Sequence, residues 1–128
     1  MNPYEELDLR AREAESLQDS AAVLYDLLSG GYSVWTDGSL YNIKQLVARV
    51  KGLQIHVYPN EHSPPHFHVK SPDVEACFTI HDCTFLRGNI DGREQHLVQW
   101  WYERSRPQLV ATWNATRPSN CPVGPIRE

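Results

Sequence analysis

Three of the six histidines in this 128-residue chain lie within seven positions of one another. They are His62, His66 and His68, and Pro64-Pro65 separates the first from the other two. Proline fixes φ and favours an extended conformation in the residue before it, so the pair predicts a stiff corner followed at once by a strand. Side chains at alternate strand positions share a face, which places His66 and His68 together. Because imidazole transfers protons near neutral pH and binds metals, this segment is the first candidate functional site.

Proton transfer is one chemistry that the cluster can support. One imidazole would take the proton of an RNA 2′-hydroxyl, and the other would protonate the leaving oxygen. His66 and His68 are the candidates for these two roles, with Glu61 and His62 on the loop just before them. An arginine would stabilise the charge of the transition state. This reaction needs few residues and no metal, which suits a small domain.

Metal binding is the second chemistry. The spacing His62-x3-His66-x-His68 supplies three neutral nitrogens, enough for a zinc or iron site with an open coordination position. The next carboxylates are Asp73 and Glu75, and they do not fall at the spacing of a cupin or a metallo-hydrolase signature. The motif is therefore a metal-site hypothesis that its surroundings do not complete.

A structural role is the third interpretation. One of His66 and His68 would then be partly buried and hydrogen-bonded, and the rigid loop would serve as a recognition surface for a partner protein or a nucleic acid. Exposure of both rings in a concave site would favour catalysis, whereas burial would favour the structural interpretation. The sequence leaves all three interpretations open.

The surroundings of the histidine motif resemble the bacterial family called domain of unknown function 4160. The resemblance covers about residues 46–127. It is carried, besides the Pro-Pro-His-x-His core, by an apolar strand from Ile55 to Tyr58, an acidic-apolar segment from Glu75 to Ile80, the pair Arg87-Gly88, and a helical tail with Trp100, Arg106, Leu109 and Trp113 that ends in Pro125-Ile126.

The resemblance implies a bacterial protein that works with a partner. Genes of this family often neighbour a second small gene, and such pairs are described as toxin–antitoxin-like, so we expect a small partner protein encoded nearby. Arg87 matches a family position and becomes the candidate for stabilising the transition state. The leading hypothesis is a metal-independent ribonuclease without a cofactor, whose catalytic residues are His66, His68, His62, Glu61 and Arg87. The alternatives are a non-catalytic regulator that binds a partner or nucleic acid, and a small zinc- or iron-binding domain.

Composition and charge narrow the class of protein. A formal charge of −4 argues against a general nucleic-acid binder, because phosphate affinity comes mainly from Lys and Arg. Residues 1–26 hold seven acidic and two basic side chains, whereas residues 27–128 hold nine acidic and ten basic ones, so an RNA site stays open in the second part. No apolar run approaches membrane-span length, and the three cysteines show no metal spacing. We expect a cytoplasmic protein with reduced thiols, not associated with a membrane, and leave open whether it forms a homo-oligomer.

The pattern of residues predicts an α+β fold: a small antiparallel meander followed by two short C-terminal helices, with an N-terminal helical extension. Residues 1–45 form the extension and 46–128 the histidine-rich domain. The expected elements are a helix over 4–18, a second helix capped by Asp19 or Ser20 and ended by Gly30-Gly31, a hairpin over 32–43, strands over 46–50, 53–58, 66–70, 75–80 and 84–90, and helices over 93–104 and 108–116 separated at Pro107.

Overall fold

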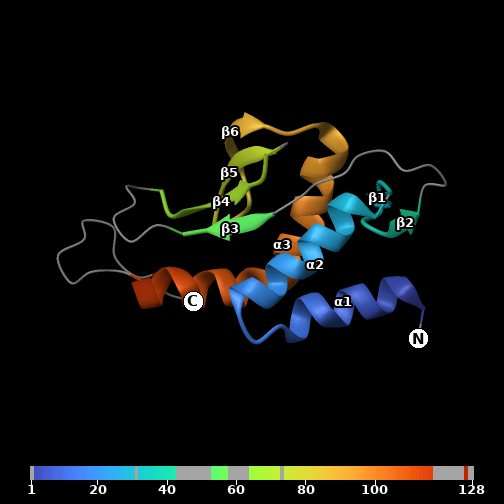
Figure 1. Ribbon diagram of the computed structural model, residues 1–128, viewed down its shortest axis with the longest axis horizontal. Helices are drawn as coiled ribbons and strands as arrows, with labels where there is room; N and C mark the ends of the chain where they lie inside the picture. The colour runs from blue at the N-terminus through green and yellow to red at the C-terminus, as the bar shows by residue number, and fades with distance from the viewer. Residues whose placement is uncertain are drawn as a thin grey trace.

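The computed structural model describes residues 2–30, 32–42, 53–57, 64–72, 74–116 and 126. Two helices and a β-hairpin come first along the chain, a four-stranded antiparallel sheet follows, and a long helix comes last (Figure 1). The predicted α+β class and the antiparallel meander are therefore confirmed. The strand expected over 46–50 lies outside the described residues.

The first helix, α1 (Pro3–Glu13), begins at Asn2. The side-chain oxygen of Asn2 accepts a hydrogen bond of 2.9 Å from the backbone amide of Glu5, one of the amides that helix geometry leaves without a partner. The helix expected over 4–18 ends earlier than predicted, because Ala14 has an extended backbone with φ −58° and ψ 131°.

The second helix, α2 (Leu17–Ser29), begins after a cap that sequence reasoning placed wrongly. The hydroxyl of Ser16 accepts a hydrogen bond of 3.1 Å from the amide of Asp19, so Asp19 and Ser20 lie within the first turn and cap nothing. Ser16 fulfils the N-cap requirement one turn earlier than predicted. The predicted end at Gly30 is confirmed.

The predicted hairpin is present and consists of β1 (Tyr32–Val34) and β2 (Leu40–Asn42). Its turn contains Asp37 and Gly38, as the sequence predicts. Gly38 has φ +90°, a conformation that glycine adopts without the steric cost of a side chain. The Asp37 carboxylate accepts a hydrogen bond of 2.9 Å from the Ser39 amide, which closes the turn.

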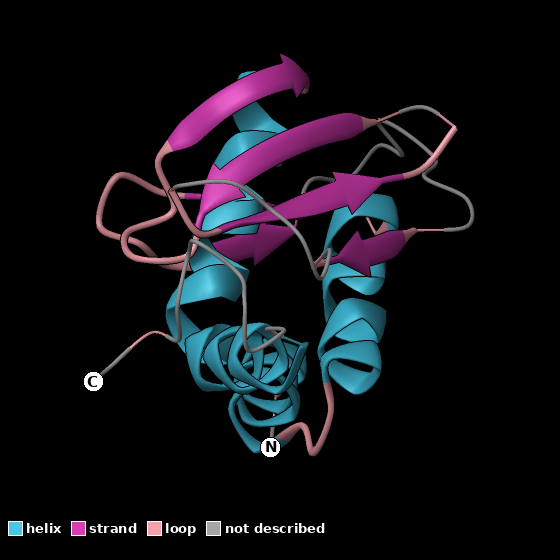
Figure 2. Cartoon of the chain, turned by 90° about the vertical axis from the view of Figure 1, so that its left-hand side faces the viewer, coloured by secondary structure: helices cyan, strands magenta, loops and turns pink. Residues whose placement is uncertain are grey.

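The four-stranded sheet has the order β3 (Gln54–His56), β4 (His66–Lys70), β5 (Glu75–Thr79) and β6 (Phe85–Asn89), with every neighbouring pair antiparallel. The strand predicted over 66–70 has the predicted bounds, and the other three are one to three residues shorter than predicted. In Figure 2 the strands cross in front of the long C-terminal helix, which covers one face of the sheet.

One continuous helix, α3 (Gly92–Thr116), replaces the two C-terminal helices predicted from Pro107. The helix begins with a reciprocal cap: the Glu94 amide donates to the Asp91 carboxylate over 2.7 Å, and the Asp91 amide donates to the Glu94 carboxylate over 3.1 Å. Pro107 costs one backbone hydrogen bond, but it lies on the exposed side of the helix. Trp101 before it and Trp113 after it are both fully buried, so the packing of both halves in one core holds the helix together.

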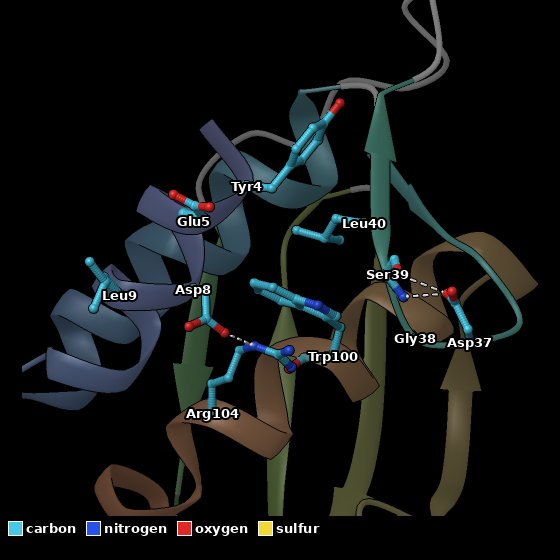
Figure 3. Close-up of a pocket in the computed structure, with 10 residues that line it drawn as sticks. All are labelled: Tyr4, Glu5, Asp8, Leu9, Asp37, Gly38, Ser39, Leu40, Trp100 and Arg104. Atoms are coloured by element: carbon cyan, nitrogen blue, oxygen red, sulfur yellow. Dashed lines mark hydrogen bonds and ion pairs between the residues drawn. The ribbon is translucent and has the colours of Figure 1, made fainter. Parts of the chain in front are cut away.

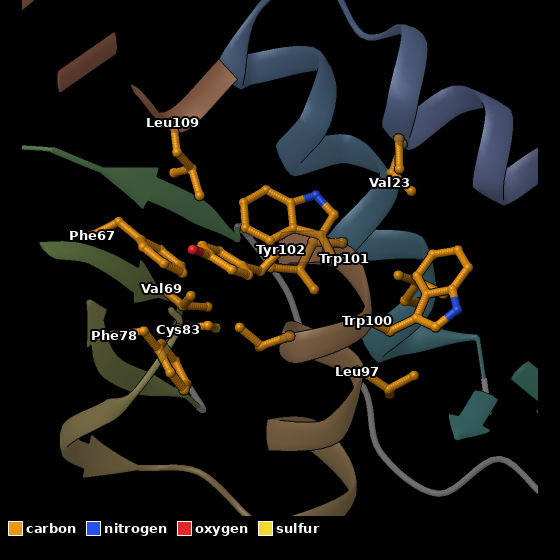
Figure 4. Packing of buried hydrophobic residues seen from close by; sticks show 14 of the residues in the cluster. Val23, Phe67, Val69, Phe78, Cys83, Leu97, Trp100, Trp101, Tyr102 and Leu109 are labelled. Carbon is orange, nitrogen blue, oxygen red and sulfur yellow. The ribbon is translucent and has the colours of Figure 1, made fainter. Parts of the chain in front are cut away.

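The core lies between the sheet and α3 (Figure 4). The Phe67 ring stacks on Phe78 with centroids 5.6 Å apart and contacts Trp101 and Tyr102 of α3 at 5.9 and 6.2 Å. At the end of the chain, Ile126 is buried in the same core. Among the helices that the structure describes, none combines the length and apolar character needed to cross a membrane.

The N-terminal helices pack on α3, and α2 also contacts β3. The Trp101 indole donates a hydrogen bond of 2.6 Å to the Ser20 carbonyl, and the Ser105 hydroxyl donates one of 3.1 Å to the Ala11 carbonyl. Leu7 and Leu24 belong to the same buried cluster as the sheet residues. The N-terminal extension therefore docks on its own chain, while the domain boundary at residue 45 stays a prediction.

Candidate functional site

Strand register lines up four chemically active side chains across the sheet. His56 of β3 lies opposite His68 of β4, His68 lies opposite Cys77 of β5, and Cys77 lies opposite Arg87 of β6. Directly opposed residues in antiparallel strands project from the same face. We call these four residues the cross-strand row. It occupies the face that points away from Phe67 and α3.

The neighbouring positions on this face are polar as well. Gln54, Lys70, Glu75 and Asn89 form a second row in the same way, and all four side chains are exposed. The Gln54 side-chain oxygen lies 2.8 Å from His56 Nε2, so an amide orients this ring. Since a carbonyl oxygen only accepts hydrogen bonds, Nε2 of His56 carries a proton.

His68 and Cys77 form the tightest contact of the cross-strand row. The distance between His68 Nδ1 and Cys77 Sγ is 3.0 Å, which is hydrogen-bonding distance for a thiol and an imidazole. His68 is partly buried and Cys77 is 5% exposed. The contact fixes the orientation of the His68 ring, and orientation of a base by a second group is a common feature of proton-transfer sites.

His66 lies on the same face as His68, as predicted, with ring centroids 5.0 Å apart. It differs in exposure, because only 1% of His66 is accessible to solvent. Its Nδ1 lies 2.7 Å from the Pro64 carbonyl oxygen and therefore donates a hydrogen bond to it. His66 thus fastens the first residue of β4 to Pro64-Pro65, which we call the proline corner.

Helix α3 supports this corner from behind. The Ile80 amide donates a hydrogen bond of 2.9 Å to the Pro65 carbonyl, and the Ile80 carbonyl accepts one from the Tyr102 hydroxyl. Burial raises the pKa of the Tyr102 phenol, so the hydroxyl keeps the proton that it donates. Arg106 Nε donates to the same hydroxyl over 3.1 Å. A continuous series of contacts therefore connects α3 with the residues that precede His66.

The pair Arg87-Gly88 combines an exposed cation with a glycine that the backbone requires. A bulge between β5 and β6 sets Arg87 opposite Cys77. Gly88 has φ +130°, and a Cβ atom there would come within 2.3 Å of the Glu75 carbonyl oxygen. Only glycine allows the two strands to approach this closely, and the approach places Arg87 in the row.

The turn between β5 and β6 is held by hydrogen bonds and contains a second thiol. The Asp82 carboxylate accepts hydrogen bonds from the hydroxyls of Thr79 and Thr84 over 2.5 and 2.7 Å, and these bonds lower its pKa. Cys83 between them has φ +59° and is buried in the core. Burial raises the pKa of the Cys83 thiol to about 12, so this thiol is inert at neutral pH.

The sequence-predicted site residues fall into three groups. His68 and Arg87 lie in the cross-strand row, separated only by Cys77. His66 shares the face but is buried beside the row. Glu61 and His62 lie outside the described residues, so their catalytic roles stay predictions.

Two members of the row escaped sequence reasoning. The alternation of β3 places His56 on one face of its strand, but only the pairing with β4 shows that this is the face of His68. Cys77 lies between Ala76 and Phe78 and looks in the sequence like a small core residue. The alternation of β3 carried the signal for His56 and that of β5 for Cys77, but the register between strands is not encoded locally.

Among the described residues, no group of three His, Cys, Asp or Glu side chains is arranged to hold a metal ion. Because His62 is not among them, the predicted three-histidine site is not tested and stays a prediction.

The fold and the row define a small α+β domain with a polar sheet face opposite a helix-covered one. Residues 52–114 match the family described as Domain of unknown function (DUF4160). The cross-strand row and nearly all of α3 lie within the matched range. This part of the chain is a domain of that family, as its motif predicts. No curated protein and no solved structure matches the chain significantly.

Proposed function

We propose that this chain is one component of a toxin–antitoxin-like pair and that its cross-strand row cleaves RNA by proton transfer. The observation that carries the proposal is the register that puts His56, His68 and Arg87 on one face. Neighbouring strands lie about 4.8 Å apart, so the backbones at His68 and Arg87 are separated by roughly 10 Å. That gap suits a phosphate held between an imidazole and a long guanidinium side chain.

The reaction follows from the chemistry of these groups. One imidazole accepts the 2′-hydroxyl proton, the 2′-oxygen forms a bond to phosphorus, and the bond from phosphorus to the 5′-oxygen breaks. The other imidazole donates its proton to the departing 5′-oxygen. The products are a 2′,3′-cyclic phosphate and a free 5′-hydroxyl. Arg87 stabilises the charge that builds up on the phosphate oxygens in the transition state.

This proposal assigns the leading role to His68 and gives His66 a positioning role. Both rings of the row, His56 and His68, retain some exposure, whereas His66 is buried against the proline corner. A buried ring does not reach an RNA phosphate, but it holds the start of β4 and therefore the position of His68. Glu61 and His62 remain candidates to assist from the preceding loop.

The burial of His66 favours a second candidate function, that of a non-catalytic regulator. A hydrogen-bonded, buried His66 is what the structural interpretation of the motif predicts, and it fits a non-catalytic regulator that uses the polar sheet face for binding. A non-catalytic regulator would still bind its target when His68 loses its imidazole, but it would lose this binding when Arg87 loses its charge. The two candidates therefore separate at His68.

Expression in bacteria tests the proposal. Wild-type protein should arrest growth and fragment total RNA, and both effects should disappear in His68→Ala and in Arg87→Ala. His81→Ala is the matched control, because His81 is an exposed histidine in the β5–β6 turn outside the row. Growth arrest that persists in His68→Ala would sink the catalytic assignment, and intact RNA with wild-type protein would leave the regulator as the better description.

The remaining alternative, a zinc or iron site, has its own test. Protein purified without a histidine tag should then carry metal near one equivalent, and His68→Ala should lose it. Elemental analysis of both proteins decides this point independently of any RNA assay.

A further inference from the structure

Two clefts flank the turn of the β1–β2 hairpin, and we call them the hairpin clefts. The first, of about 700 Å³, lies between α1, the hairpin and α3 (Figure 3). The second, of about 340 Å³, lies between the hairpin and α3. Gly38 and Trp100 line both, so the two clefts adjoin each other at these residues.

This surface carries an excess of negative charge. Four carboxylates and one guanidinium line the clefts. The carboxylates belong to Glu5, Asp8, Asp37 and Glu103, and the guanidinium belongs to Arg104. Two carboxylates of the acidic N-terminal segment, Glu5 and Asp8, thus lie beside the hairpin.

The positive charge of Arg104 is already engaged. Its Nε lies 2.5 Å from Asp8 Oδ1, its Nη1 donates to the Trp100 carbonyl over 2.8 Å, and its guanidinium stacks 3.8 Å above the Trp100 ring. The cleft therefore already binds one cationic side chain, which pairs with both a carboxylate and the face of an indole ring. Arg104 and Arg12 together neutralise Asp8, so the charge of Glu5 and Asp37, and part of the charge of Glu103, is left for a ligand.

The other carboxylates are available at the cleft edges. Asp37 accepts hydrogen bonds from the Ser39 hydroxyl and amide, which lower its pKa and keep it ionised. Glu103 is 59% exposed and lies 3.8 Å from Arg104, beyond a short ion pair. Glu5 lies in the first turn of α1 and is also exposed.

An exposed tryptophan completes the surface. Trp35 is 56% exposed, although large aromatic side chains are normally buried. Its ring stacks on Tyr41 with centroids 4.2 Å apart, so it is held in place rather than free to rotate. A fixed aromatic ring beside carboxylates attracts lysine and arginine side chains, and tryptophan often anchors protein interfaces.

We propose that the hairpin clefts dock a basic segment of a partner protein, with one cationic side chain over Trp35 and others paired with Asp37, Glu103 and Glu5. The proposal rests on the partner relationship in the proposed function and names the chemistry of that partner. RNA does not fit here, because its phosphates would meet carboxylates. The clefts and the cross-strand row therefore bind ligands of opposite charge.

Binding of a fluorescein-labelled peptide of alternating arginine and glycine tests this docking site. Full-length protein should bind it, and the affinity should fall as salt rises. Trp35→Ala should weaken binding about five-fold, the effect of a cation–π contact of ordinary strength, and the triple variant Glu5→Gln/Asp37→Asn/Glu103→Gln should weaken it further. The same peptide with glutamate in place of arginine should not bind.

The matched control is Glu15→Gln/Asp19→Asn, which removes acidic charge from exposed positions that do not line the clefts. Equal weakening by this control would show attraction by bulk charge and overturn the site, as would unchanged binding in Trp35→Ala. Sedimentation is the second measurement. A dimer that Trp35→Ala dissociates would place a second copy of the chain in the clefts and also overturn the proposal.

Peptide docking in the hairpin clefts and RNA cleavage by the cross-strand row can be tested separately. His68→Ala should bind the arginine peptide with unchanged affinity, and Trp35→Ala should cleave RNA at the wild-type rate. Loss of only one property in each variant shows that the two surfaces act independently, whereas peptide binding that requires His68 would contradict the assignment of docking to the hairpin clefts.

Discussion

The cross-strand row and the hairpin clefts are two surfaces built in different ways. Hydrogen-bonded strands set the spacing of the row, so sheet geometry alone brings His68 near Arg87. The clefts arise where α1, the hairpin and α3 meet, so their shape depends on side-chain packing between elements far apart in the sequence. The row offers imidazoles, a thiol and a guanidinium, while the clefts offer carboxylates and the exposed Trp35.

From this difference we infer that the cross-strand row performs chemistry and the hairpin clefts bind a partner. A row fixed by backbone register suits chemistry, because proton transfer requires groups held at constant distances. An acidic surface with a fixed aromatic ring suits docking, because charge steers an approaching partner and the ring anchors it. The row lies within residues 52–114, the range of the family match, whereas α1 and the hairpin lie before it.

Alkylation of Cys83 gives the largest expected effect and tests how tightly the core behind the row is closed. The folded pKa of about 12, against an ordinary value of 9.0, leaves about a thousandfold less thiolate at pH 8. Iodoacetamide should therefore modify Cys83 about a thousandfold more slowly in folded than in urea-unfolded protein, as read by peptide mass spectrometry. Equal rates would mean that the core opens readily.

The same thiol makes stability depend on pH. Its pKa is raised by folding, so its contribution is complete below pH 9 and is lost as the pH rises toward 12. Urea midpoints should fall across that window, and less so in Cys83→Ala. An equal fall of the urea midpoint in both proteins between pH 9 and 12 would show that Cys83 does not cause the pH dependence.

Two glycine substitutions compare the sheet that carries the cross-strand row with the hairpin turn that lines the clefts. Gly88→Ala should destabilise the protein by about 2–5 kcal/mol, because a strained φ and a clash with β5 act together. Gly38→Ala in the hairpin turn should cost only about 1–2 kcal/mol, since no atom lies within 4 Å of its added Cβ. Urea unfolding measures both, and equal losses would contradict the close strand approach that positions Arg87.

Tyr102→Phe tests the support behind the proline corner. Loss of the hydrogen bond to the buried Ile80 carbonyl should cost about 1–2 kcal/mol. Tyr25→Phe is the control, because Tyr25 is 39% exposed and should change stability by less than about 0.5 kcal/mol. If Tyr102→Phe also lowers RNA cleavage while Tyr25→Phe does not, the corner positions the row. Unchanged stability would deny α3 this role.

Trp35→Ala should lower stability by no more than about 1 kcal/mol, because mainly its stacking on Tyr41 is lost. A clear loss of peptide binding with near-normal unfolding would separate docking from folding. A much larger destabilisation would make Trp35 a core residue and weaken the docking proposal.

The sequence predicts most elements of this fold for local reasons. Alternation defines β4 and β5, Asp37-Gly38 predicts the hairpin turn, and Gly30 predicts the end of α2. Pro107 misleads because local propensity argues for a break, whereas the buried Trp101 and Trp113 keep one helix. Tertiary packing overrides propensity there.

The candidate site is predictable only in part, and for a different reason. Spacing within β4 places His66 and His68 on one face, but it says nothing of their unequal burial. His56 and Cys77 join the row through pairing between strands, and a shift of one residue would send them to opposite faces. The hairpin clefts depend on contacts between α1 and α3, which no local pattern specifies.

Catalysis by the cross-strand row is tested most sharply by the rate at which purified protein cleaves a labelled RNA in the presence of EDTA, wild type beside His68→Ala. The wild type should cleave the RNA and leave a 2′,3′-cyclic phosphate at the new end, and the variant should cleave it about 100-fold or more slowly. Equal rates in the two proteins, or no cleavage by the wild type, would contradict the cross-strand row as a catalytic site.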